Sequence, residues 1–277
     1  MGHGSSTATV EDEGSGEYTA RELSLPMSGH WEIEVVDSPI EPVDSADVVG
    51  KYTSLKFGDD GTAHISYYEY IQADGYGVEQ LMYAHNNASY TTCDGEAENW
   101  DCYKIDFEAI DYPVNFAAFT SLDVDYEGTV HISYYKGTTG DLWLASYAGE
   151  GGNCDLFEEW NCWVIDDGGG EDTGLFTSLQ APKRPEEVTS IAYYNKTAGE
   201  LRFAFFLGTS GNCGPGDLWW CSVVDEVGAG HGQMGLSLAV SELGMPMIAY
   251  MDGSDGLAPL GLKVASPAYI QSYANCG

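Results

Sequence analysis

Apolar and polar residues alternate along short segments of this chain, and one alternating segment occurs four times. The copies begin at Thr53, Thr120, Thr177 and Leu236 and read TSLKFGDDGTAHISYY, TSLDVDYEGTVHISYY, TSLQAPKRPEEVTSIAYY and LSLAVSELGMPMIAYM. In each copy two alternating runs flank a polar turn, which predicts a strand, a turn and a second strand. The repetition therefore predicts an all-β chain rather than two unrelated domains.

Two more strands are expected in each repeat. A third alternating run occupies residues 80–85, 142–147, 201–206 and 261–266. A fourth run has the pattern Trp-x-Cys-x-x-Ile/Val-Asp and occurs at residues 100–106, 160–166 and 219–225. Four antiparallel strands per repeat indicate the blades of a β-propeller.

The two ends of the chain are expected to complete one blade together. The fourth repeat has no Trp-x-Cys strand, and Trp31 to Asp37 has that pattern with Ile33 in place of the cysteine. We therefore predict a four-bladed propeller of four antiparallel strands per blade, closed by this N-terminal strand. We assign residues 1–17 to an acidic Gly/Ser linker and residues 18–277 to the propeller.

A fragment of a propeller with five or more blades is the alternative. Tyr18 to Leu25 also has the character of a strand, and Cys276 has no counterpart at Ile33. Both features leave room for a further blade.

The repeated TSL, GTxHISYY and Leu-x-x-Ala signatures resemble those of secreted bacterial β-propeller repeat proteins, which are distantly similar to Asp-box, sialidase-like propellers. The resemblance covers about Trp31 to Gly277 and implies the propeller fold. Propellers of this kind include lectins, adhesins and glycosidases, so the resemblance implies no single activity.

Six of the seven cysteines form three close pairs, each beside the same tryptophan of its repeat: Cys93/Cys102, Cys154/Cys162 and Cys213/Cys221. Their repetition predicts three disulfides that clasp hairpins, and hence an oxidising, secreted or cell-surface location. A zinc site is less favoured, because no histidine lies near these pairs. The first residues lack the apolar core of a signal peptide, and we expect that one has been removed.

Charge excludes two classes of partner. The 44 Asp and Glu residues against 10 Lys and Arg give a formal net charge of −34. This field repels nucleic acid and anionic lipid. No apolar run approaches the roughly 20 residues that span a bilayer, so membrane insertion is not expected either.

The turn of the second copy is a candidate calcium site. Asp123, Asp125 and Glu127 alternate ahead of Gly128, as oxygen ligands do in calcium loops. The other three turns do not repeat this pattern, so an acidic β-turn without a metal is the alternative. Calcium is the one cofactor that the sequence suggests.

Two sets of repeated side chains are expected to pack rather than react. His64 and His131 share one repeat position, where the other copies have Ser190 and Met247. The tyrosines at positions 67, 134, 193 and 250 occur in every copy, on the opposite strand face. We expect these tyrosines to form the core between blades.

Catalysis is not favoured by the motifs. A sialidase needs three arginines around the substrate carboxylate, and the only arginines, Arg21, Arg184 and Arg202, do not occupy equivalent positions. A glycosidase of another type, with two carboxylates facing across the mouth of the propeller, stays open. The nucleophile, zinc-protease and nucleotide motifs of other common enzymes do not occur.

Carbohydrate binding has positive support, because Trp and Tyr faces stack on sugar rings. Trp143, Trp163 and Trp220 are the candidate ligand-binding residues, since they vary between repeats. The repeated tryptophans Trp31, Trp100, Trp160 and Trp219 are assigned to the core or to the disulfide hairpins. The sequence thus predicts a non-catalytic extracellular binding or adhesion module for glycans or a surface protein. A calcium-stabilised adhesion propeller and a glycosidase-type hydrolase are the alternatives.

Overall fold

A computed structural model describes residues 9–12, 18–21, 42–45, 48–73, 76–86, 91–95, 98–110, 118–154, 157–228, 235–252 and 261–266. The chain divides into two compact units, residues 1–41 and 42–277. In the first unit β1 (Thr9–Asp12) pairs antiparallel with β2 (Tyr18–Arg21). The stretch predicted as a linker, residues 1–17, therefore contributes a strand.

The described part of the second unit contains four antiparallel sheets, whose strands follow one another in chain order, and a short 3-10 helix, η1 (Pro215–Asp217). The first sheet contains β3 (Val48–Phe57), β4 (Ala63–Ala73), β5 (Tyr76–His85) and β6 (Asp101–Ile110). The second contains β7 (Ala118–Val124), β8 (Val130–Lys136), β9 (Asp141–Tyr147) and β10 (Trp160–Asp166). The third contains β11 (Thr173–Gln180), β12 (Ser190–Asn195), β13 (Glu200–Phe206) and β14 (Trp219–Glu226). The fourth contains β15 (Leu236–Val240), β16 (Pro246–Asp252) and β17 (Gly261–Ala265).

The all-β prediction and the order of strands within each repeat are confirmed. Three repeats form four-stranded sheets, and the described part of the fourth repeat forms a three-stranded sheet. The predicted closing strand at Trp31 to Asp37 and the residue Cys276 lie outside the described residues. No helix in the parts of the chain that the structure describes is long and apolar enough to cross a membrane.

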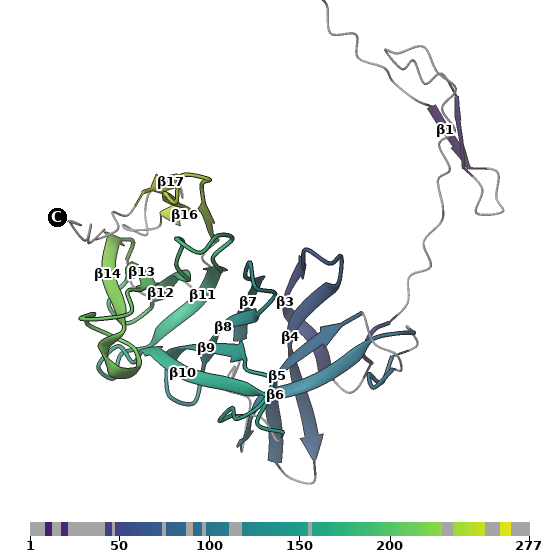
Figure 1. Cartoon of the computed structure of the whole chain (residues 1–277), viewed down its shortest axis with the longest axis horizontal. Coiled ribbons are helices and arrows are strands. Elements are labelled where there is room, and N and C mark those ends of the chain that lie inside the picture. The colour runs from purple at the N-terminus through teal and green to yellow at the C-terminus, as the bar shows by residue number, and fades with distance from the viewer. Residues whose placement is uncertain are drawn as a thin grey trace, which may run out of the picture. The chain divides into compact units, whose positions relative to one another are not determined.

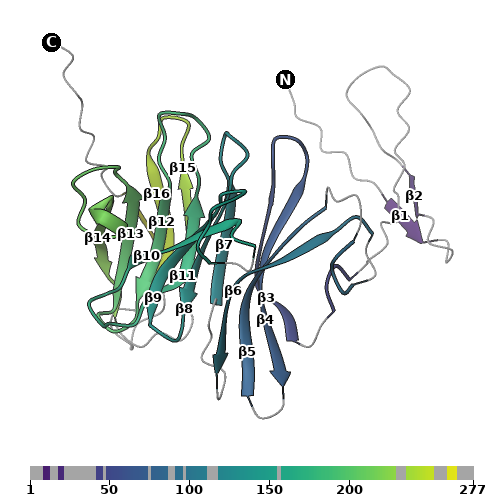
Figure 2. The ribbon, with the colours of Figure 1, turned by 60° about the horizontal axis from the view of Figure 1, so that its bottom comes forward.

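The first strands of successive sheets lie side by side, β3 next to β7, β7 next to β11 and β11 next to β15 (Figures 1 and 2). One hydrogen bond recurs at each boundary. The backbone N–H of Leu122 donates to Ser54 Oγ at 3.0 Å, that of Leu179 to Ser121 Oγ at 3.0 Å, and that of Leu238 to Ser178 Oγ at 2.9 Å. The repeated Ser-Leu pair of the sequence thus joins each sheet to the next.

Apolar faces of neighbouring sheets form the core. At the boundary of the first and second sheets, Leu81 and Ile105 pack with Leu122, Ile132 and Trp160. Equivalent side chains fill the boundary of the second and third sheets. The repeated tyrosines 67, 134, 193 and 250 are all buried, which confirms the predicted packing role.

The first strand of each four-stranded sheet contains a bulge at an aromatic residue. Tyr52, Phe119 and Phe176 have φ values of 56°, 57° and 54° where the register shifts. Positive φ is unusual for bulky residues and costs local energy. The rings contact one another, with centroids 4.7 Å apart for Tyr52 and Phe119 and 4.3 Å apart for Phe119 and Phe176.

The three predicted disulfides are present, Cys93–Cys102, Cys154–Cys162 and Cys213–Cys221. Each ties the last strand of a sheet to the loop that precedes it. Disulfides of this density are typical of proteins from an oxidising, extracellular environment.

Candidate functional site

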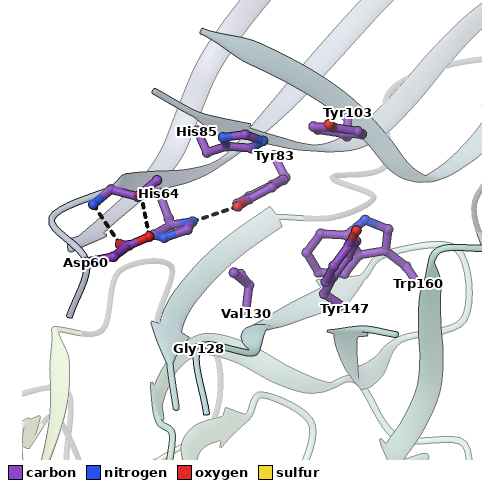
Figure 3. A pocket seen from close by; sticks show the side chains of 10 residues that line it. Asp60, His64, Tyr83, His85, Tyr103, Gly128, Val130, Tyr147 and Trp160 are labelled. Atoms are coloured by element: carbon purple, nitrogen blue, oxygen red, sulfur yellow. Dashed lines mark hydrogen bonds between the residues drawn. The ribbon is translucent and has the colours of Figure 1, made fainter. Parts of the chain in front are cut away.

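A pocket of about 250 Å³ lies at the boundary between the first and second sheets (Figure 3). The first sheet contributes residues of β4, β5, β6 and the turn before β4. The second sheet contributes residues of β8, β9, β10 and the turn before β8. The lining consists of Asp60, Thr62, His64, Tyr83, His85, Tyr103, Gly128, Val130, Tyr147 and Trp160. We call it the aromatic pocket.

Strand register brings the first-sheet residues of this pocket to one face. His64 on β4 lies opposite His85 on β5, and Tyr83 on β5 lies opposite Tyr103 on β6. Alternate residues of a strand share a face, so Tyr83 and His85 point the same way. The face packs against the second sheet, which supplies Trp160 and Tyr147.

Aromatic rings form a continuous surface around the pocket. The centroid of Tyr83 lies 5.2 Å from that of Trp160 and 5.9 Å from that of Tyr103. The ring of Tyr147 stands edge-on to Trp160 at 5.4 Å, and it is 44% exposed. His85 stacks on Tyr103 at 5.8 Å. Tyr83 and Trp160 are buried, at 6% and 1% exposure, so a ligand in the pocket would meet mainly the rings of Tyr147, Tyr103 and His85.

Many polar groups of the pocket are bonded to one another. His64 Nδ1 and the Tyr83 hydroxyl are 2.6 Å apart. The Tyr103 hydroxyl donates to Asp101 Oδ2 at 2.7 Å. The carboxylate of Asp60 accepts hydrogen bonds from Thr62 N and Thr62 Oγ1, each at 2.9 Å. These bonds hold the rings in place.

Burial sets the charge state of the pocket. It lowers the pKa of His64, and the neighbouring His85 lowers it further, while Asp60 acts in the opposite direction. Burial also lowers the pKa of His85. The pKa values of Tyr83 and Tyr103 are raised, chiefly by burial. At pH 7 both imidazoles are therefore neutral and both phenols keep their protons.

Two of the three predicted ligand-binding tryptophans lie in a second hollow of about 510 Å³. This outer groove lies along β10 and the loop around Pro215, and its lining includes Trp143, Trp163, Asp166, Asp167 and Asp217. Lys136 Nζ lies 4.4 Å from the centroid of the Trp143 ring, so part of that ring is covered. Trp220 lines neither hollow and packs against the core of the third and fourth sheets.

Two of the three predicted calcium ligands, Asp123 and Asp125, accept hydrogen bonds from other groups of the protein, and Glu127 lies in the exposed turn. Asp123 is buried and accepts hydrogen bonds from Lys183 Nζ and from the backbone N–H of Ala181, both at 2.8 Å. Asp125 Oδ1 accepts from the backbone N–H groups of Glu127 and Thr129. Within the described ranges, no three His, Cys, Asp or Glu side chains form a group that could hold a metal ion.

A row of hydrogen bonds joins Asp125, His131 and Ser146. His131 Nε2 is 3.1 Å from Asp125 Oδ2, and His131 Nδ1 is 2.7 Å from Ser146 Oγ. These are the residue types of a serine hydrolase triad. Ser146 is only 8% exposed, and neither hollow described above includes it. The row joins the acidic turn to β9, in keeping with the packing role predicted for His131.

The core position predicted for Trp160 agrees with its 1% exposure, and His64, predicted to pack, also lines the pocket. Tyr83, His85, Tyr103 and Tyr147 are not among the site residues predicted from the sequence. The signal that marks these positions is their variation between repeats. Strand register aligns Tyr83 with Leu144 and Phe203, and His85 with Ser146 and Phe205. Polar aromatic residues at positions that are elsewhere apolar or small therefore identify the pocket.

Two comparisons with known proteins give no match. A scan against models of protein families finds no match to the chain, and a search of curated proteins finds no matching sequence either.

Proposed function

We propose that the chain is a non-catalytic, extracellular carbohydrate-binding module with the architecture of a β-propeller. The observation that carries the proposal is the aromatic pocket between the first and second sheets, with its partly exposed Tyr147. Aromatic faces beside a few fixed polar groups are the usual lining of sugar-binding sites.

Repeated contacts support the propeller architecture. Each of the three boundaries between consecutive sheets has the same Ser-Leu hydrogen bond and brings their first strands together. Propeller blades are arranged in this way, with their first strands towards a common axis.

Exposed apolar residues support closure of the propeller between the first and fourth sheets. Leu55 is 54% exposed, whereas Leu122, at the same place in the second sheet, is fully buried. Leu262 of the fourth sheet is 83% exposed, whereas its counterpart Leu142 is fully buried. We propose that these two faces meet and form one further boundary. The strand predicted at Trp31 to Asp37 would complete the fourth sheet there.

Binding is favoured over glycoside hydrolysis by the distribution of carboxylates. Glycosidases use two carboxyl groups that flank the bond to be cleaved. Asp60 is the one carboxylate among the residues that line the aromatic pocket. Secretion is supported by the three disulfides.

A glycan array followed by titration calorimetry tests the proposal. We expect Tyr147→Ala to weaken the best glycan about tenfold, the loss of one stacking contact. Trp163→Ala, a matched change in the outer groove, is expected to leave the affinity unchanged. Loss of binding in Trp163→Ala alone would move the site to the outer groove, and an array without binding would refute the glycan function.

A further inference from the structure

We infer that the sugar seated in the aromatic pocket carries a positively charged amino group, so that the module selects amino sugars with free amines. This inference rests on the proposed function, and it names the chemical class of the ligand.

The ring faces favour a cation. An ammonium group within about 6 Å of an aromatic centroid is attracted by the negative face of the ring, and several rings around one group strengthen the attraction. Tyr103 of the first sheet and Tyr147 of the second line the pocket with exposed ring surface, while Tyr83 and Trp160 behind the lining are buried (Figure 3). A positive group within the pocket would lie close to more than one of these rings.

The charges near the rings have one sign. Asp60 is part of the lining, and the lining contains neither lysine nor arginine. Asp101 accepts a hydrogen bond from Tyr103, and Glu159 acts on the same tyrosine electrostatically. A carboxylate or sulfate on a sugar would therefore be repelled, whereas an ammonium group would be attracted.

The two histidines do not offset the negative charge around the pocket. His64 and His85 have ring centroids 6.4 Å apart and are partly buried among aromatic rings. Both are neutral at pH 7, so they add no positive charge that would compete with a cationic ligand.

Internal hydrogen bonds reduce what the pocket offers to a neutral sugar. The Tyr83 hydroxyl is paired with His64, the Tyr103 hydroxyl with Asp101, and Asp60 with Thr62. A neutral sugar is held mainly by hydrogen bonds between its hydroxyl groups and the protein. An ammonium group is attracted by ring faces and nearby carboxylates, and this attraction needs no free hydrogen-bond donor on the protein. The pocket therefore discriminates by charge more than by hydroxyl pattern.

The field of the whole protein acts in the same direction. A net charge of −34 concentrates cations near the surface and speeds their association. Because salt screens this field, binding of a cationic sugar is expected to weaken as the ionic strength rises.

Titration calorimetry with three tetrasaccharides of matched length tests the inference. The ligands are a glucosamine tetramer, its fully N-acetylated form and a galacturonic acid tetramer, at about pH 7, where the free amines are partly protonated and the acetamides carry no charge. We expect the glucosamine tetramer to bind at least about tenfold more tightly than the acetylated form, and the acidic tetramer not to bind.

Two variants that each remove one negative charge test whether the amino sugar binds in the aromatic pocket. Asp60→Asn is expected to weaken the glucosamine tetramer severalfold, whereas Asp167→Asn in the outer groove should leave its affinity unchanged. Equal affinity for the amine and the acetylated form overturns the inference and leaves the proposed function standing. Binding of no glycan at all, on the array or by calorimetry, overturns both.

Discussion

The hydroxyl of Tyr193 in the third sheet donates a hydrogen bond to Asp166 Oδ2 in the second sheet at 2.5 Å. The same pair recurs at the other boundaries, as Tyr134 with Asp106 at 2.8 Å and Tyr250 with Asp225 at 2.7 Å. A cation completes each group, since Arg202, Lys136 and Lys263 also contact these carboxylates. The repeated aspartate of the Trp-x-Cys strand is thus the acceptor that joins one sheet to the next.

Replacing Tyr193 with Phe is expected to lower the free energy of unfolding by about 1.5–3 kcal/mol. The change keeps the buried ring and removes only the donor to a charged acceptor. Urea denaturation measures the effect. Tyr126→Phe, in an exposed turn, should change stability by less than about 0.5 kcal/mol. A Tyr193 variant as stable as this control would show that the hydrogen bond does not stabilise the fold.

A second prediction concerns the serine in the first strand of each sheet. Ser121→Ala removes the acceptor of the Leu179 N–H and should cost about 1 kcal/mol. Ser237 holds the same place in the fourth sheet. If the propeller closes onto the first sheet, with the Leu55 N–H as donor, Ser237→Ala should cost a similar amount. A cost near zero for Ser237→Ala alone, measured by urea denaturation, would contradict the closure.

Much of the fold could be predicted from the sequence because its signals are local. The alternation around Ser121 and Ser178, and the spacing of Cys154 and Cys162, lie within single hairpins. The structure has these strands and this disulfide. The burial of Tyr134 followed from its place on the strand, but its bond to Asp106 did not, because it joins two sheets.

The candidate site could not be predicted in the same way, because it forms where distant segments meet. Tyr83 and Trp160 contact each other across a boundary between sheets, and neither has a motif around it. Asp123 resembled a metal ligand beside Asp125, yet its partner Lys183 lies 60 residues further along the chain. A single sequence shows which positions repeat, but not which faces meet.

Loss of one disulfide should be costly although the loop that it closes is short. Replacing Cys154 and Cys162 together with Ser is expected to lower the free energy of unfolding by about 2–3 kcal/mol, because the unfolded chain becomes less constrained. Urea denaturation of the variant under oxidising conditions measures this cost. A reducing agent should lower the stability of the unmodified protein further, since three bridges then open. Stability that does not respond to reduction would contradict a structural role for the bridges.

Calcium is expected to have no specific effect on stability, because Asp123 and Asp125 already have partners in the fold. Thermal melts with calcium, with magnesium and with a chelator at equal ionic strength should therefore have the same Tm. A ligand that binds only the folded state raises Tm. A rise of several degrees with calcium alone would restore the calcium site in the turn of residues 123–127.

Mild acid should destabilise the protein through the histidines of the aromatic pocket. Burial holds the pKa of His64 and that of His85 below the value of 6.5 that histidine has when exposed. The unfolded chain therefore binds protons more readily than the folded protein, and the stability present above about pH 6.5 is lost as the pH falls towards the folded-state pKa values.

Urea denaturation between about pH 7 and pH 5 measures this loss, and NMR titration of the imidazoles gives the two pKa values directly. Partly buried carboxyl groups whose pKa is lowered, such as Asp125 and Asp225, lose their contribution only below about pH 5 and do not interfere. The variants His64→Gln and His85→Gln keep a polar side chain without a titrating group, so each should flatten the pH dependence. Imidazole pKa values at or above 6.5 would contradict the burial of these rings.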